Sequence, residues 1–150
     1  MTPRAWALLP LRLMIGFGFA SHGYAKLARG PDSFAPIVAA LGMPAPQLTA
    51  WITTLVEFFG GLLLMVGGFV VPLSLPLAAI MLVAMFGIHL RYGFSSIRLK
   101  ALTSAGAEFG PAGYELNLVY LAGIATLALG GPGPLSLDRF RLNRKQGGPT

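Results

Sequence analysis

The residues of this chain that could do chemistry are few, and they lie inside or beside long apolar stretches. Glu57 interrupts the apolar run 47–70, and Glu115 stands near the start of the run 113–129. Ionisable groups within a membrane-length run are costly, usually face other helices and pair with one another. A histidine beside buried carboxylates can supply protons near neutral pH. His22, Glu57 and Glu115 are therefore candidates for a proton relay.

Helices that alternate in direction would bring the polar residues to one half of a membrane. At about 1.5 Å per residue, Glu57 lies about 15 Å from the start of its run, near the middle of a bilayer. Burial disfavours a charged carboxylate, so Glu57 must be protonated or matched by a cation such as Lys26 or Arg91. The residues expected to line a polar pocket in the outer leaflet half are His22, Lys26, Glu57, His89, Arg91, Tyr92, Tyr114, Glu115 and Asn117.

Most of these residues also have simpler structural explanations. Snorkelling to the membrane interface explains Lys26, Arg91 and Tyr92. A carboxylate such as Glu115 favours a helix N-terminus through the dipole, and the two histidines can be structural hydrogen-bonding groups. Glu57 has no such simple explanation, which makes it the central candidate.

Two metal-containing alternatives use the histidines. Met81, Met85 and His89 share a rough helical face, and soft ligands of this kind select Cu(I). His22 and His89 lie at similar depth on different helices and could hold a haem axially. Helical methionines more often serve packing, and no haem attachment motif occurs in the sequence. The candidate metal ligands are His22, His89 and Met85.

The composition is that of a membrane protein. The chain has 150 residues, of which 55% are hydrophobic and 11% charged, whereas soluble domains carry about 25% charged residues. This length fits one domain over residues 1–150. The absence of cysteine excludes disulfides and thiol chemistry. The net charge of +6 comes from basic residues scattered at segment ends, which favours anionic lipid headgroups as the partner rather than nucleic acid.

The apolar runs predict an all-α integral membrane protein with a four-helix antiparallel bundle, since about 20 residues cross a bilayer core. The predicted membrane helices span residues 6–27, 47–70, 72–92 and 113–129. Asp32 and the apolar stripe after it predict a short amphipathic helix over 32–42 that lies on the membrane surface. Pro72 predicts a tight hairpin between the second and third helices.

The remaining segments are expected outside the membrane. Residues 93–112 are interpreted as a polar connection, and a Gly-Pro-rich stretch leads to the basic tail 138–150. Six basic residues on the side of the termini against five on the other favour cytoplasmic termini under the positive-inside rule. The first run also mimics a signal peptide cleaved after Ala20, but the three spans that follow favour an anchor.

Three motifs follow one another in a fixed order. They are His22-Gly23 with Lys26, the stretch Glu-Phe-Phe-Gly-Gly over 57–61, and Tyr-Glu-Leu over 114–116. This combination resembles the DoxX family of small bacterial membrane proteins, over roughly residues 11–138. The resemblance implies a multi-pass helical bundle in the bacterial inner membrane and a link to oxidoreductases. The family name comes from a membrane subunit associated with thiosulfate:quinone oxidoreductase; without cysteine, a complete thiosulfate oxidase is not expected on this chain.

Three functions are compatible with these observations. The first is a membrane subunit of an oxidoreductase complex that binds quinone in the polar pocket and receives electrons from a partner protein, since the sequence has no flavin, iron–sulfur or haem motif. The second is a non-catalytic anchor or assembly factor for a periplasmic redox or metal-handling partner. The third is a transporter of a small solute or metal, which the apolar inner half disfavours. Gly18, Gly60 and Gly61 are expected to open room for a flat ligand, and glycine-rich helix faces permit a homo-oligomer.

Overall fold

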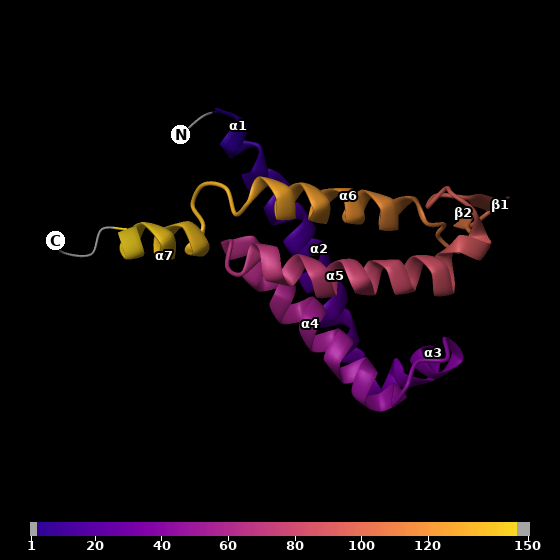
Figure 1. The fold of residues 1–150 in the computed structure, drawn as a ribbon. Helices are drawn as coiled ribbons and strands as arrows, with labels where there is room; N and C mark the ends of the chain where they lie inside the picture. The colour runs from indigo at the N-terminus through magenta and orange to yellow at the C-terminus, as the bar shows by residue number, and fades with distance from the viewer. Residues whose placement is uncertain (1–2, 147–150) are drawn as a thin grey trace.

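The computed structural model describes residues 3–146, and most of them are helical (Figure 1). The long helices are α2 (Leu8–Arg29), α4 (Pro46–Val66), α5 (Val70–Ala84) and α6 (Glu115–Gly130). The shorter helices are α1 (Pro3–Trp6), α3 (Ala35–Ala40) and α7 (Leu137–Gln146), with a 3₁₀ turn at Pro31–Ser33. A hairpin of β1 (Leu99–Thr103) and β2 (Gly106–Phe109) lies between α5 and α6.

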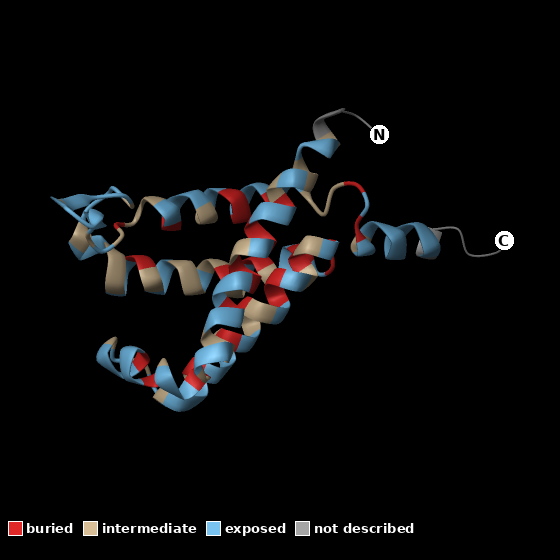
Figure 2. Ribbon diagram, turned by 180° about the vertical axis from the view of Figure 1, so that it is seen from behind, coloured by how far each residue is buried: buried red, intermediate tan, exposed pale blue. Residues whose placement is uncertain are grey.

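The long helices form two antiparallel pairs. Figure 1 shows α2 and α4 running obliquely to the pair of α5 and α6. The pairs meet near the α4–α5 turn and diverge towards α3 and the β-hairpin. Phe19, Leu64, Leu77 and Leu127, one from each long helix, are buried together in the core. Figure 2 shows that buried residues concentrate where the pairs cross, whereas the hairpin and the far end of α3 are exposed.

Glycines bring α2 and α4 into backbone contact. A Cβ atom on Gly61 would lie 2.4 Å from the backbone nitrogen of Ala20, and one on Gly23 would lie 2.4 Å from that of Phe58. Such small residues let membrane helices approach closely. The expectation that Gly18 and Gly61 open room for a ligand is wrong, because the Tyr120 side chain and the α2 backbone occupy that space.

Two of the four predicted spans are long and apolar enough to cross a membrane. They are α4, with 21 residues, and the 23-residue stretch Val70–Tyr92, in which α5 continues through a π-helical turn at Met85–His89 and a 3₁₀ turn at Leu90–Tyr92. Helix α6 is apolar but has 16 residues. Only three residues, 67–69, separate α4 from α5, which confirms a tight turn there, although the two helices diverge from it (Figure 1). Pro72 lies in the first turn of α5. Backbone N–H groups in the first turn have no acceptor within the helix, so a proline there costs no helical hydrogen bond.

The segment predicted as an amphipathic helix over 32–42 is less regular than expected. It consists of the 3₁₀ turn and the six-residue helix α3. Asp32 caps neither of them by a side-chain hydrogen bond; its carboxylate accepts a hydrogen bond from Trp51 Nε1 at 3.2 Å. Val38 is buried against Ala50 of α4, while Ile37 is exposed. One face of the segment therefore packs on α4 and the other is free.

Two segments outside the long helices carry more structure than the sequence indicated. The connection 93–112 contains the antiparallel β-hairpin, in which Thr103 pairs with Gly106. Both faces of the hairpin are exposed, and Leu102 is exposed by 80%. Because neither face is buried, the sequence of these strands does not alternate between apolar and polar residues. The basic tail predicted over 138–150 forms helix α7 as far as Gln146, and residues 147–150 lie outside the described part of the chain.

Candidate functional site: a buried ion pair beside an apolar cavity

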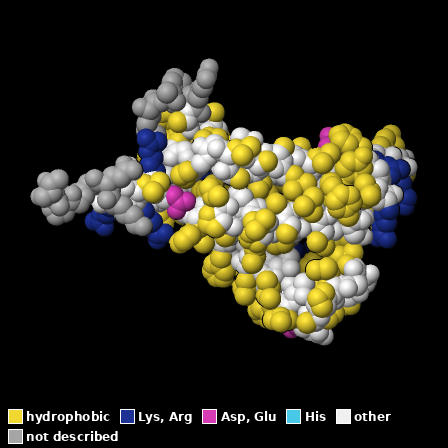
Figure 3. All heavy atoms as spheres, viewed as in Figure 1, with side chains coloured by type: hydrophobic (Ala, Val, Ile, Leu, Met, Phe, Trp, Pro, Cys, Tyr) yellow, Lys and Arg dark blue, Asp and Glu magenta, His cyan; other side chains and the backbone are white. Residues whose placement is uncertain are grey.

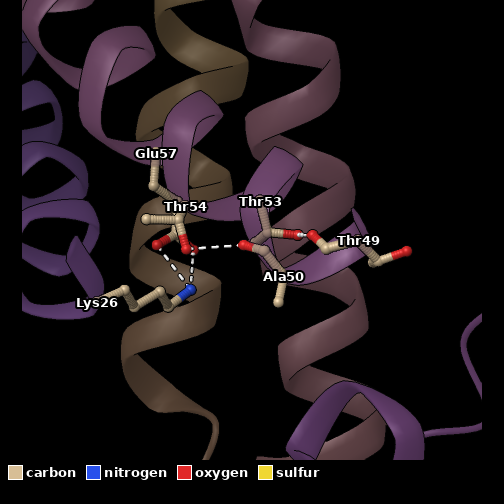
Figure 4. A network of polar contacts seen from close by, with 6 residues as sticks. All are labelled: Lys26, Thr49, Ala50, Thr53, Thr54 and Glu57. Carbon is tan, nitrogen blue, oxygen red and sulfur yellow. Dashed lines mark hydrogen bonds and ion pairs between the residues drawn. The ribbon is translucent and has the colours of Figure 1, made fainter. Parts of the chain in front are cut away.

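Lys26 of α2 and Glu57 of α4 form an ion pair between the two helices (Figure 4). Lys26 Nζ donates a hydrogen bond to Glu57 Oε1 at 2.8 Å and lies 2.7 Å from Oε2. The Glu57 side chain is 4% exposed and that of Lys26 21%. Lys26 is thus the cation that matches the carboxylate. Arg91, the other candidate, is exposed and lies over the ring of Tyr92 at 4.8 Å.

The ion pair retains hydrogen-bonding capacity. Glu57 Oε2 is buried and, despite its closeness to the ammonium group, accepts no aligned hydrogen bond from the described residues. An ammonium group has three donors, and the hydrogen bond to Oε1 uses one of them. The Lys26 nitrogen also lies 4.2 Å from the ring centre of Phe34, a cation–π contact that needs no hydrogen bond. The Lys26 ammonium group can therefore still donate to a ligand, whereas the Glu57 carboxylate is buried against it.

A cavity of about 190 Å³ adjoins this pair, between the two helix pairs. Its polar lining residues are Lys26, Glu57, Thr49 and Thr53. The threonine hydroxyls donate to backbone carbonyls, that of Thr53 to Thr49 O and that of Thr49 to Pro44 O, each at 2.7 Å. The apolar lining residues are Phe34, Val38, Leu41, Met43, Ala79, Ile80, Val83, Ala84 and Ile88. Figure 3 shows a hollow in this region with a Lys or Arg side chain inside it.

The π-helical turn of the third long helix shapes one wall of the cavity. Ala84 precedes the turn and Ile88 lies within it, and both line the cavity. A Cβ atom on Gly87 would lie 2.6 Å from the side chain of Leu41, the residue that follows α3, so this side chain lies directly against the turn. Turns of this kind occur frequently at functional sites. The cavity wall thus depends on a contact between two elements that are distant in sequence.

Several other predicted site residues hold the connection between α5 and α6. His89 Nδ1 lies 2.9 Å from Ala112 O, and Glu115 Oε2 accepts a hydrogen bond from Ser96 N at 3.0 Å. The Tyr114 ring packs edge-on against Phe94 at 5.6 Å. These contacts match the structural roles that the sequence left open for such residues.

The remaining candidates lie apart from the ion pair. Asn117 is buried and donates to Met81 O at 3.4 Å. His22 is exposed on α2 and does not line the cavity. Residues 3–146 contain no group of three or more His, Asp or Glu side chains arranged to hold a metal ion. Two roles stay predictions: metal binding by His22, His89 and Met85, and proton transfer by His22 and Glu115.

Arg12 has an important structural role that the sequence did not reveal. Its side chain is buried, with 1% of the residue exposed. Its Nε donates to Met65 O at 3.1 Å, and its other nitrogens donate to carbonyls of the loop after α6. Those carbonyls belong to Pro132, Pro134 and Leu135. The Gly-Pro-Gly-Pro stretch is the sequence feature that could have indicated these acceptors. Prolines lack the N–H needed for regular backbone pairing, so carbonyls in such a stretch are left without backbone partners.

Asp138 completes the same end of the bundle. Its carboxylate accepts hydrogen bonds from the backbone nitrogens of Phe69 and Val70, at 2.8 and 3.0 Å. These nitrogens belong to the start of α5, so a residue of α7 caps a helix that begins almost seventy positions earlier. The start of the C-terminal helix is thereby fixed to the α4–α5 turn.

The fold and the site define a helical membrane protein with a buried ion pair beside an apolar cavity. Residues 7–90 match the DoxX family, and the chain belongs to that family. The match covers more than half of the chain and includes Lys26, Glu57 and every cavity-lining residue, which confirms the resemblance noted in the sequence. No curated protein and no solved structure matches the chain.

Proposed function

We propose that this chain is a membrane subunit of an oxidoreductase complex and that its cavity binds the headgroup of a quinone. The observation that carries this proposal is the Lys26–Glu57 pair, whose unused hydrogen-bonding capacity lies at the wall of an otherwise apolar cavity. Ligand pockets are typically apolar, with a small number of polar groups that fix the orientation of the ligand. The cavity has this composition.

The lining residues suit a quinone headgroup. The headgroup is a flat ring with two carbonyl acceptors, and a free N–H of Lys26 can donate to one of them. Phe34 and Ile80 supply apolar wall for the ring. The volume of about 190 Å³ accommodates a single ring rather than a long tail, which would remain in the lipid. Glu57 keeps the ammonium group in place, because both carboxylate oxygens lie within 2.8 Å of the Lys26 nitrogen. A bound quinone would supply electron and proton transfer.

A multi-pass arrangement in the bacterial inner membrane fits this function. In it α2, α4, the stretch Val70–Tyr92 and α6 cross the bilayer, and both termini lie in the cytoplasm. The 22 residues of α2 measure about 33 Å, enough for a bilayer core. Arg12 does not prevent this, because protein carbonyls surround its guanidinium group. Figure 3 supports the arrangement: hydrophobic side chains cover the middle of the visible face, and Lys and Arg gather at its ends.

Binding of a short-chain quinone to the purified protein tests the proposal. Quinones quench tryptophan fluorescence, and Trp51 stands on α4 two positions from each of the cavity residues Thr49 and Thr53. We expect saturable quenching in the wild type and its loss in Lys26→Met. Ala84→Leu, which narrows the cavity without touching the ion pair, should weaken binding about tenfold, the effect of about 1.4 kcal/mol.

Ala122→Leu is the matched control, because Ala122 is exposed on α6 and does not line the cavity. It should bind quinone like the wild type. A Trp6→Phe background isolates the signal of Trp51. If Lys26→Met and Ala84→Leu are both folded and bind quinone as tightly as the wild type, the cavity is not the quinone site.

A different observation favours a second function, an anchor or assembly factor for a periplasmic redox or metal-handling partner. The β-hairpin presents apolar side chains to the outside, with Leu99 exposed by 62% and Leu102 by 80%. A protein partner could cover them. In that case the quinone titration would show no saturation, and Lys26→Met would lower stability alone. Leu102→Ser would then reduce recovery of the partner with the purified protein.

A further inference from the structure

A second hollow, at the end of the bundle near α7, combines an apolar wall with a basic one. Phe69, Val71 and Pro72 at the start of α5 form its apolar wall. Arg141 and Arg144 of α7 form its basic wall, and Asp138, whose carboxylate accepts two backbone hydrogen bonds, also lines it. This hollow is separate from the cavity at Lys26 and Glu57, which lies between α3 and the later part of the same membrane-length helix. Figure 1 shows α7 extending beyond the bundle at this end.

The two arginines are positioned but lack anionic partners. Arg141 lies over the ring of Phe69 at 5.0 Å, and Arg144 lies over the ring of Phe140 at 5.3 Å. Within residues 3–146, neither guanidinium group has an ion pair or a hydrogen bond to a side chain. The base of α7 is fixed because Asp138 caps α5 and its own N–H donates to Gly67 O at 3.0 Å. The guanidinium donors are therefore held beside the apolar wall and remain free for an anion.

The apolar wall continues along the membrane-length helix. Val71 and Leu75 are one turn apart on α5 and are exposed by 55% and 78%. They form a strip that leads from the arginines towards the middle of the stretch Val70–Tyr92. A phospholipid has the matching chemistry, with an anionic phosphate at one end and an acyl chain beside it. Basic pockets at the ends of membrane helices bind such headgroups, and Arg pairs with phosphate through two parallel hydrogen bonds.

We propose that Arg141 and Arg144 bind the phosphate of an anionic phospholipid whose acyl chain lies along Val71 and Leu75. The lipid would belong to the leaflet on the side of the chain termini. It would bridge α7 and α5, adding to the contacts of Asp138. This site does not depend on quinone binding, because none of its residues lines the cavity at Lys26.

Native mass spectrometry of the full chain in mild detergent tests this site. Phosphatidylglycerol and phosphatidylcholine with identical acyl chains are added separately, and the lipid retained per chain is measured. We expect the wild type to retain phosphatidylglycerol about 30-fold better, since each of the two arginines contributes about 1 kcal/mol towards anionic lipid. The double variant Arg141→Gln/Arg144→Gln should lose this preference.

Arg139→Gln provides the matched control. Arg139 is exposed on the same helix and does not line this hollow, and its substitution removes one charge, as each single variant Arg141→Gln or Arg144→Gln does. The preference should survive in Arg139→Gln. Equal retention of the two lipids by the wild type, or an equal loss in Arg139→Gln and in either single variant of the pair, would overturn the proposal. Complete displacement of the lipid by millimolar inorganic phosphate would also overturn it, by showing that the site takes a free anion.

Discussion

Lys26 Nζ lies within 2.8 Å of both carboxylate oxygens of Glu57, although the two residues stand on different helices and are 31 positions apart. This contact depends on the close approach of α2 and α4. Gly23 packs against the backbone of Phe58, the residue after Glu57, and Gly61 packs against Ala20. The glycines therefore determine whether the ammonium group can reach the carboxylate. Because these two groups form much of the polar wall of the cavity, the glycines also determine that wall.

The ion pair should stabilise the bundle as a unit. Removing one partner of a buried pair costs about 3–5 kcal/mol, and we expect about 2 kcal/mol here because Lys26 is partly exposed. Glu57→Gln and Lys26→Met should each lower the midpoint of thermal unfolding in detergent, followed by circular dichroism. The double variant should be more stable than the sum of the single effects allows, because no unpaired charge remains. Additive losses would show that the two side chains do not interact.

The two neighbouring glycines of α4 should respond differently to alanine. A Cβ atom on Gly61 would lie 2.4 Å from the backbone of Ala20, whereas one on Gly60 meets Leu77 at 3.6 Å, an ordinary contact. Gly61→Ala should force the helices apart and lower thermal stability by several degrees. Gly60→Ala should be neutral or slightly stabilising, because alanine favours a helix over glycine by about 1 kcal/mol. Equal effects of the two substitutions would contradict the packing described for α2 and α4.

Arg12 should tie the loop after α6 to the rest of the bundle. Arg12→Met keeps much of the side-chain volume but leaves the carbonyls of Met65, Pro134 and Leu135 without this donor. Each buried group left unsatisfied costs about 1–3 kcal/mol. We expect limited proteolysis to cut the loop 131–136 much faster than in the wild type. Arg12→Lys should rescue little, since a single ammonium group cannot reproduce the planar fork of donors.

Asp138 should act as a helix cap supplied from a distance. Asp138→Ala removes both acceptors of the Phe69 and Val70 N–H groups and should cost about 1 kcal/mol, the typical value for losing a cap. Asp138→Asn retains one acceptor and should cost less. Hydrogen exchange of the first turn of α5, followed by mass spectrometry, measures the effect locally. Unchanged protection in Asp138→Ala would exclude this capping role.

The sequence predicted the long helices well because their signal is length and continuous apolarity. The run 47–70 corresponds to α4, and the run 72–92 to the stretch that begins at Val70. The β-hairpin gave no signal, since its strands bury neither face. The tail helix α7 was also missed, because its charged residues resemble those of an unstructured basic segment.

The candidate site was predicted in part. Glu57 followed from the cost of a carboxylate inside an apolar run, and Lys26 and Arg91 were both candidate partners. The choice between them depends on the contact between α2 and α4, which one sequence does not specify. His89 and Glu115 were grouped with the pocket because helix depth was the available measure, yet both bind the backbone of the α5–α6 connection. The role of Arg12 was not predicted, because carbonyl partners 120 or more positions away leave no local pattern.

The most direct measurement is the amount of quinone that accompanies the protein when it is extracted from its own membrane in mild detergent. Quinone is quantified per chain by chromatography of an organic extract, for the wild type, Lys26→Met and the control Ala122→Leu. Binding at the ion pair predicts near-stoichiometric quinone in the wild type and the control, and almost none in folded Lys26→Met. Absence of quinone from the wild type, or equal amounts in all three proteins, would contradict it.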